Sequence, residues 1–255
     1  MSQDKQSSNL TQNVMSVVML ILSIVIVHSF YEFYVHPAAN AALAAGGSAA
    51  ARNFFVIIKD MEQEVCIIAM LWCCYLIMAK AIPLFNDKGL FTQNFLAGFD
   101  KDGDIDFEQA LVEFEKSEYA DKALLETWIT CIRRFNYTQN VQNASDALQA
   151  SVEALAIRLE AGNSMIRYLI WAIPSIGFIG TVRGIGQALA HADEALAGNI
   201  AGMTDSLGVA FNSTLVALFI SIFLMLLLHQ LQRLQDGLVV DTQAHCEKYL
   251  LKYLH

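Results

Sequence analysis

Four runs of apolar residues divide the chain, and each is close to the length of a membrane-crossing helix. They cover Val14–Phe30, Val65–Phe85, Met165–Ala190 and Leu207–Leu228. A helix needs about 20 mainly apolar residues to cross the hydrocarbon core of a bilayer. The pattern therefore predicts an all-α, polytopic membrane protein with four transmembrane helices.

Between the second and third runs, apolar residues recur three or four positions apart, as on one face of a helix. The stripes are Phe107, Leu111 and Phe114; Leu124 or Leu125 with Trp128, Ile129 and Ile132; and Val141, Ala144, Leu148, Val152, Leu155 and Leu159. The last stripe leads into the third run, and leucines up to Leu238 extend the fourth run. We expect a helical domain into which these two membrane helices project.

The same pattern gives the domain boundaries. Residues 1–13 precede the first span, 14–85 hold the first two spans and their loop, 86–160 form the helical domain, 161–230 hold the third and fourth spans, and 231–255 form a C-terminal helix. The loop between the last two spans carries Asp193, Glu194 and Asp205 but no Lys or Arg, so it should lie outside the cell. Both termini and the helical domain are then expected in the cytoplasm.

Composition agrees with a membrane protein and excludes several functions. The chain is 55% hydrophobic and 16% charged, with a mean hydropathy of +0.42. Its net charge of -9 argues against nucleic acid as a partner. The cysteines show neither a disulfide framework nor metal-ligand spacing, and no nucleotide-binding loop, nucleophile elbow or zinc-protease motif is present. We expect no enzyme activity and no cofactor.

The third run contains an unusual set of small and polar residues, IPSIGFIGTVRGIG. Pro174 would break a helix in water, but in a membrane neighbouring helices and hydroxyl side chains can satisfy the freed backbone. Gly177, Gly180 and Gly184 allow close approach of another helix. We interpret Pro174 and these three glycines as a hinge and packing face. Thr181 lies within the same stretch.

The fourth run has a polar cluster of its own, Asn212, Ser213 and Thr214. Two apolar helices with a few polar side chains facing a shared interior suggest an ion path. No Asp or Glu lies within the third or fourth run. Because a proton relay needs a titratable group, the sequence predicts that another polypeptide supplies it.

The stretch from Pro174 to Ile185, taken with Thr214, resembles the signature of the MotA/TolQ/ExbB proton channel family, especially its ExbB and TolQ branch. The resemblance implies that Thr181 and Thr214, with Ser213 and Asn212, line an ion pathway. It also implies a single-span partner resembling ExbD, TolR or MotB, whose membrane helix carries an Asp. The assembly would be a homopentamer around two partner copies in the bacterial cytoplasmic (inner) membrane, moving H+ or alternatively Na+ and converting ion-motive force into mechanical work.

Two positions depart from that resemblance. Arg183 stands where the branch commonly has an aromatic residue, and Val209 where it often has an acid. An arginine at this depth is costly unless it reaches the surface or pairs with an acid; Asp193, Glu194 or a partner carboxylate are the candidates. Arg183 is therefore expected at an interface. These departures leave open a non-conducting pentameric scaffold.

An acidic loop in the helical domain leaves a further alternative, a calcium-responsive regulator. Asp100, Asp102, Asp104, Asp106 and Glu108 resemble the start of a calcium-binding EF-hand loop from which two residues are missing. The simpler interpretation is an acidic turn in which Asp106 caps the next helix, with Gln109 at the capping-box position.

Overall fold

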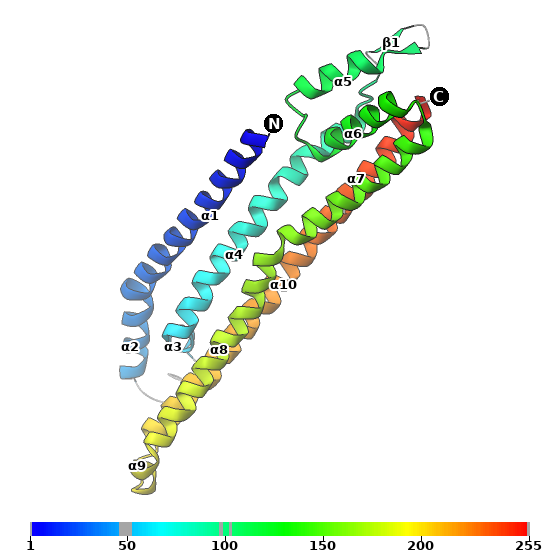
Figure 1. The fold of residues 1–255 in the computed structure, drawn as a ribbon. Coiled ribbons are helices and arrows are strands. Elements are labelled where there is room, and N and C mark those ends of the chain that lie inside the picture. The colour runs from blue at the N-terminus through cyan, green and yellow to red at the C-terminus, as the bar shows by residue number, and fades with distance from the viewer. Residues whose placement is uncertain (1, 46–52, 97–98, 102–103, 254–255) are drawn as a thin grey trace. The chain divides into compact units, whose positions relative to one another are not determined.

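The protein is almost entirely helical in a computed structural model that describes residues 2–45, 53–96, 99–101 and 104–253 (Figure 1). The α-helices are α1 (Ser2–Phe30), α2 (His36–Ala45), α3 (Phe54–Ile58), α4 (Met61–Asn86), α5 (Phe107–Lys116), α6 (Ala123–Thr138), α7 (Val141–Gly162), α8 (Ser164–Ala190), α9 (Ala192–Leu196) and α10 (Ala201–Tyr249). A π-helical turn, η1 (Tyr31–Val35), joins α1 to α2; η3 (Asp87–Thr92) and η4 (Leu251–Tyr253) are 3-10 turns. The predicted all-α fold is confirmed, with one addition: the two-residue strands β1 (Asp100–Lys101) and β2 (Asp104–Ile105) pair as an antiparallel hairpin.

Four helical stretches among the described residues are long and apolar enough to cross a membrane, one for each predicted span. They are Asn13–Ala45, Met61–Thr92, Val141–Ala190 and Ala201–Tyr253. The last two far exceed the ~20 residues that a crossing needs, as expected for helices that continue beyond the membrane. The continuation is unbroken in α10, whereas α7 and α8 are separated at Asn163.

Contacts divide the chain into two compact units. Residues 1–78 and 165–228 form the first, which contains the apolar helices and is called the membrane unit below. Within it, Tyr31 and Val35 of η1 are fully buried and pack with Ile58 of α3. Trp72 of α4 donates its indole N–H to the carbonyl of Ser16 in α1 at 3.0 Å. These contacts attach the first two apolar helices to each other.

Residues 79–164 and 229–255 form the second compact unit, called the helical unit below. The stripes expected from the sequence supply its core: Leu124, Trp128 and Ile132 of α6 are buried together with Phe114 of α5 and Leu148 of α7. The predicted helical domain therefore has a hydrophobic core of its own.

Candidate ion pathway

The α8 and α10 helices of the membrane unit pack along a line of small residues. A Cβ atom at Gly177 would lie 2.5 Å from the Cβ of Ala217, and one at Gly184 would lie 2.7 Å from the backbone nitrogen of Ala210. Only a missing side chain permits such separations, so the two backbones are in direct contact at these positions. The expected packing face is therefore present, and within one chain it holds α8 against α10.

Pro174 lies inside α8 without ending it. Proline has no N–H, so the carbonyl of Ile170, four residues earlier, loses its helical donor. Ser221 of α10 replaces that donor: its hydroxyl donates to the Ile170 carbonyl at 3.0 Å, in a buried position. A neighbouring hydroxyl thus satisfies the freed backbone group, as the sequence pattern predicts.

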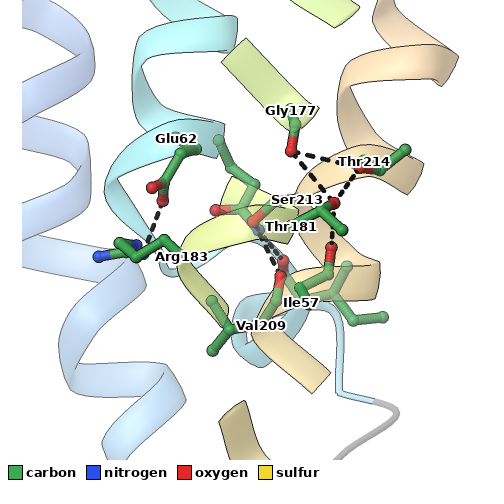
Figure 2. A network of polar contacts seen from close by, with 10 residues as sticks. Ile57, Glu62, Gly177, Thr181, Arg183, Val209, Ser213 and Thr214 are labelled. Carbon is green, nitrogen blue, oxygen red and sulfur yellow. Dashed lines mark hydrogen bonds and ion pairs between the residues drawn. The ribbon is translucent and has the colours of Figure 1, made fainter. Parts of the chain in front are cut away.

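The two threonines singled out from the sequence meet across the same interface (Figure 2). The hydroxyl of Thr181 lies against that of Thr214, 2.9 Å from the carbonyl of Ala210 and 3.4 Å from that of Gly177. The Thr214 hydroxyl lies 3.2 Å from the carbonyl of Gly177. Each threonine hydroxyl has one proton to donate and two lone pairs that can accept. The two hydroxyls therefore keep lone pairs that can accept a hydrogen bond from a further donor.

Ser213 and Asn212 precede Thr214 on α10, and their side chains differ in burial and contacts. Ser213 is buried and donates to the Val209 carbonyl of its own helix at 2.8 Å, as membrane serines commonly do. Asn212 is half-buried, and among the described residues it does not join the contacts between Thr181 and Thr214. The structure thus brings together the two threonines, while Ser213 contacts Gly180 and Gln63 beside them.

Arg183 pairs with an acid, but with a different one from those that the sequence suggested. Its guanidinium donates to a carboxylate oxygen of Glu62 in the first turn of α4 at 2.7 Å (Figure 2). Glu194 instead lies 3.3 Å from a ring nitrogen of His191. Asp193 and Glu194 were therefore the wrong candidates, because they follow α8 in sequence while Glu62 faces it from a neighbouring helix.

Glu62 and Gln63 are site residues that sequence reasoning missed. Both are buried, and the amide nitrogen of Gln63 donates to the Ile57 carbonyl at 3.1 Å and approaches the Ser213 hydroxyl at 3.4 Å. The predicted second span began at Val65, which left both residues in a loop. A signal was available: Arg183 requires a counter-ion, and two acidic residues, Glu62 and Glu64, stand just before the second apolar run.

The acidic loop of the helical unit contains the predicted cap. The Asp106 carboxylate accepts from the backbone N–H of Gln109 at 2.9 Å, at the start of α5. Glu108 is exposed in the first turn of that helix. Asp102 lies outside the described residues, and the backbones of Asp100 and Asp104 belong to the short hairpin. The capping interpretation is confirmed, while calcium binding stays a prediction.

Comparison with known proteins shows which family this chain resembles. A model of the MotA/TolQ/ExbB proton channel family matches residues 115–244, just over half of the chain, including α8 and both threonines. No curated protein and no solved structure matches the chain. Proteins of this family are proton channel subunits of energy-transducing complexes and associate with single-span partner proteins. The chain, with four apolar helices long enough to cross a membrane, belongs to the MotA/TolQ/ExbB proton channel family.

Proposed function

We propose that this chain is the ion-conducting subunit of a membrane motor, passing protons between its own threonine pair and an Asp on the membrane helix of a single-span partner. The observation that carries this proposal is the contact between Thr181 and Thr214 across α8 and α10. Two hydroxyls with free lone pairs, between two mainly apolar helices, offer a protonated carboxyl or a water molecule hydrogen-bonding groups that hydrocarbon lacks.

The assembly that we propose is a homopentamer around two partner copies in the bacterial cytoplasmic membrane, with both termini in the cytoplasm. The acidic loop that follows α8 supports this orientation, because it lacks Lys and Arg. One charge that crosses about 100 mV releases about 2.3 kcal/mol. Repeated protonation and release of the partner's Asp can use that energy to move the ring stepwise around the partner. Protons are favoured over Na+ by the family to which the chain belongs.

A non-conducting scaffold is the alternative, and the ion pair of Arg183 weakens its main support. An unpaired arginine among the channel helices would indicate a path that no longer conducts. Arg183 is instead paired with Glu62 at 2.7 Å, so its charge does not by itself block cations.

The test is proton flux through the purified complex. An affinity-tagged copy would be isolated with its co-purifying single-span protein, reconstituted in vesicles that contain a pH-sensitive dye, and energised with a potassium diffusion potential. Thr181→Val and Thr214→Val keep the side-chain shape but remove the hydroxyls. Each should lower flux by roughly tenfold or more while the complex still elutes at the wild-type size.

Thr204→Val is the matched control, because Thr204 is an exposed α10 residue whose hydroxyl bonds the Ile200 carbonyl of its own helix at 2.9 Å. It should conduct like the wild type. Full flux in both threonine-pair variants would contradict the proposed pathway. An assembled wild-type complex that passes no ions would favour the scaffold.

A further inference from the structure

The membrane unit contains a carboxylate that its apolar helices do not require for packing. The side chain of Glu62 is 4% exposed and that of Arg183 is 39% exposed, and their charged atoms lie 2.7 Å apart. Removing charges from water is costly even when they are paired, and an apolar pair of the same size often stabilises a fold at least as well. The pair therefore suggests a role beyond stability.

Gly180 brings the Glu62 side chain beside Ser213, the residue before Thr214. A Cβ atom at Gly180 would lie 2.6 Å from the hydroxyl oxygen of Ser213 and 3.1 Å from the Cγ of Glu62. Ser213 and Glu62 therefore both approach the same bare stretch of α8 backbone. Thr181 follows Gly180, and Thr214 follows Ser213. The Glu62 side chain thus lies one residue along each helix from the threonine contact.

Gln63 follows Glu62 and contacts Ser213, and its amide oxygen has no hydrogen-bond partner among the described residues. Its amide nitrogen faces Ile57 and Ser213, which directs its amide oxygen elsewhere. That oxygen is fully buried and, like one carboxylate oxygen of Asp60, has no hydrogen-bond partner among the described residues. Buried oxygens without partners in native proteins commonly bind ordered water. A water molecule bound to this oxygen would add a hydrogen-bonding group at Gln63, the residue that contacts Ser213 and follows Glu62.

The charged groups around Glu62 come from α8 and from the segment before α4. Arg183 approaches from α8, and Asp60, which precedes α4, interacts electrostatically with Lys59, Arg183 and Glu62. From α10 comes the neutral Ser213, whose hydroxyl lies 3.4 Å from the amide nitrogen of Gln63. Glu64, two residues away, is occupied by His28 of α1 at 2.9 Å. Arg183 contacts the Glu62 carboxylate at 2.7 Å, and its half-exposed guanidinium can also meet a second carboxylate from outside the chain.

We propose that Glu62 is an ionisable group that this chain itself places in its ion pathway, with Arg183 as its positioning residue. The Glu62 carboxylate takes one proton from a hydronium ion of the pathway, which becomes water, and its ion pair with Arg183 opens. The proton later passes to another water molecule as the pair closes again, so one O–H bond breaks for each one that forms. The role rests on the proposed function, and it differs from the expectation that a partner supplies the titratable group.

Glu62→Gln, Arg183→Gln and the double variant would be measured in the flux assay described above. Glu62→Gln should reduce flux by roughly tenfold or more, since a glutamine side chain cannot take up the proton. The double variant replaces the ion pair with two neutral amides, so it restores the charge balance of the fold but not the titratable group. It should assemble and still fail to conduct. Glu64→Gln is the matched control, because Glu64 lies in the same helical turn and is also ion-paired.

Arg183→Gln separates positioning from structure. Without the guanidinium, the Glu62 carboxylate loses the partner that positions it, so the pH profile of flux should differ from that of the wild type while conduction persists. A double variant that conducts like the wild type would show that the pair is only structural and would overturn the role of Glu62 alone. A wild-type complex that passes no protons would overturn both this role and the proposed function.

Discussion

At the scale of single residues, the membrane unit is determined by how each polar group inside it finds a partner. Pro174 and Ser221 show this most simply, because one removes a donor and the other replaces it. The Thr181 and Thr214 pair uses backbone carbonyls of both helices in the same way. In a bilayer, where water cannot satisfy these groups, each such match specifies which residues face each other.

Ser221→Ala is therefore expected to destabilise the membrane unit by about 1–3 kcal/mol, because the buried Ile170 carbonyl loses its donor. In a Pro174→Ala background the restored backbone N–H at position 174 can reach that carbonyl, so the serine substitution should cost much less. A double-mutant cycle, measured by thermal unfolding in detergent, tests the coupling. Ser175→Ala is the control, since Ser175 is exposed and bonds the Trp171 carbonyl of its own helix. Strictly additive effects would contradict the assignment.

The sequence could identify these residues but not all of their partners. Pro174, Thr181 and Thr214 are unusual in apolar runs, so composition alone marks them. Helical periodicity gives the face on which a residue lies. It does not say which residues of a neighbouring helix lie opposite that face. Arg183 was assigned to the wrong acids for this reason: Glu62 is 121 positions away along the chain.

At the scale of elements, the site depends on how far each helix is shifted along its axis relative to its neighbours. The first turn of α4 faces Gly180 and Arg183, although α8 continues to Ala190. The limits of an apolar run say where hydrophobicity stops, not where that point lies beside another helix. A residue predicted just outside one span can thus face the interior of the next, as Glu62 does.

The close contact between α8 and α10 predicts different effects of an alanine substitution at two glycines of α8. A Cβ at Gly184 would meet the backbone of Ala210 at 2.7 Å and that of Ser206 at 2.8 Å, whereas nothing lies within 4 Å of one at Gly186. Gly184→Ala should destabilise the unit by about 1–3 kcal/mol through overpacking. Gly186→Ala should be neutral or stabilising by up to about 1 kcal/mol, since alanine favours the helix. Thermal unfolding in detergent distinguishes them, and equal effects would show that α8 and α10 do not pack this closely.

At the scale of the whole molecule, the sequence predicts both the apolar helices of the membrane unit and the core of the helical unit. Run length predicted the four apolar helices, and helical spacing predicted the core stripes of the helical unit, because both depend on local pattern alone. The break between α7 and α8 did not follow from the pattern. Asn163 at that break exchanges hydrogen bonds with Gln235 of α10, at 2.6 Å in the shorter direction, and such a long-range contact leaves no periodic signal.

The helical unit also contains a titratable group whose position has a measurable consequence. His245 of α10 packs against the rings of Phe95, Trp128 and Tyr249, and its Nε2–H donates to the Gln93 carbonyl at 2.9 Å. Its other ring nitrogen is buried without a partner among the described residues. Burial lowers the pKa of His245, an effect that the bond to Gln93 partly offsets and the nearby Lys248 charge reinforces.

A lowered pKa means that the unfolded chain binds a proton at this site more readily than the folded one does. The stability that neutral His245 contributes is therefore complete above about pH 6.5 and is lost as the pH falls through the folded-state pKa. Thermal unfolding followed by tryptophan fluorescence should show a Tm that falls between about pH 7 and pH 5, and His245→Gln should flatten this dependence because the glutamine side chain does not titrate. His229→Gln, at an exposed histidine of the same helix, should leave it unchanged. If His245→Gln retains the full wild-type pH dependence, the loss of stability arises elsewhere in the chain, and the aromatic pocket does not hold a neutral histidine.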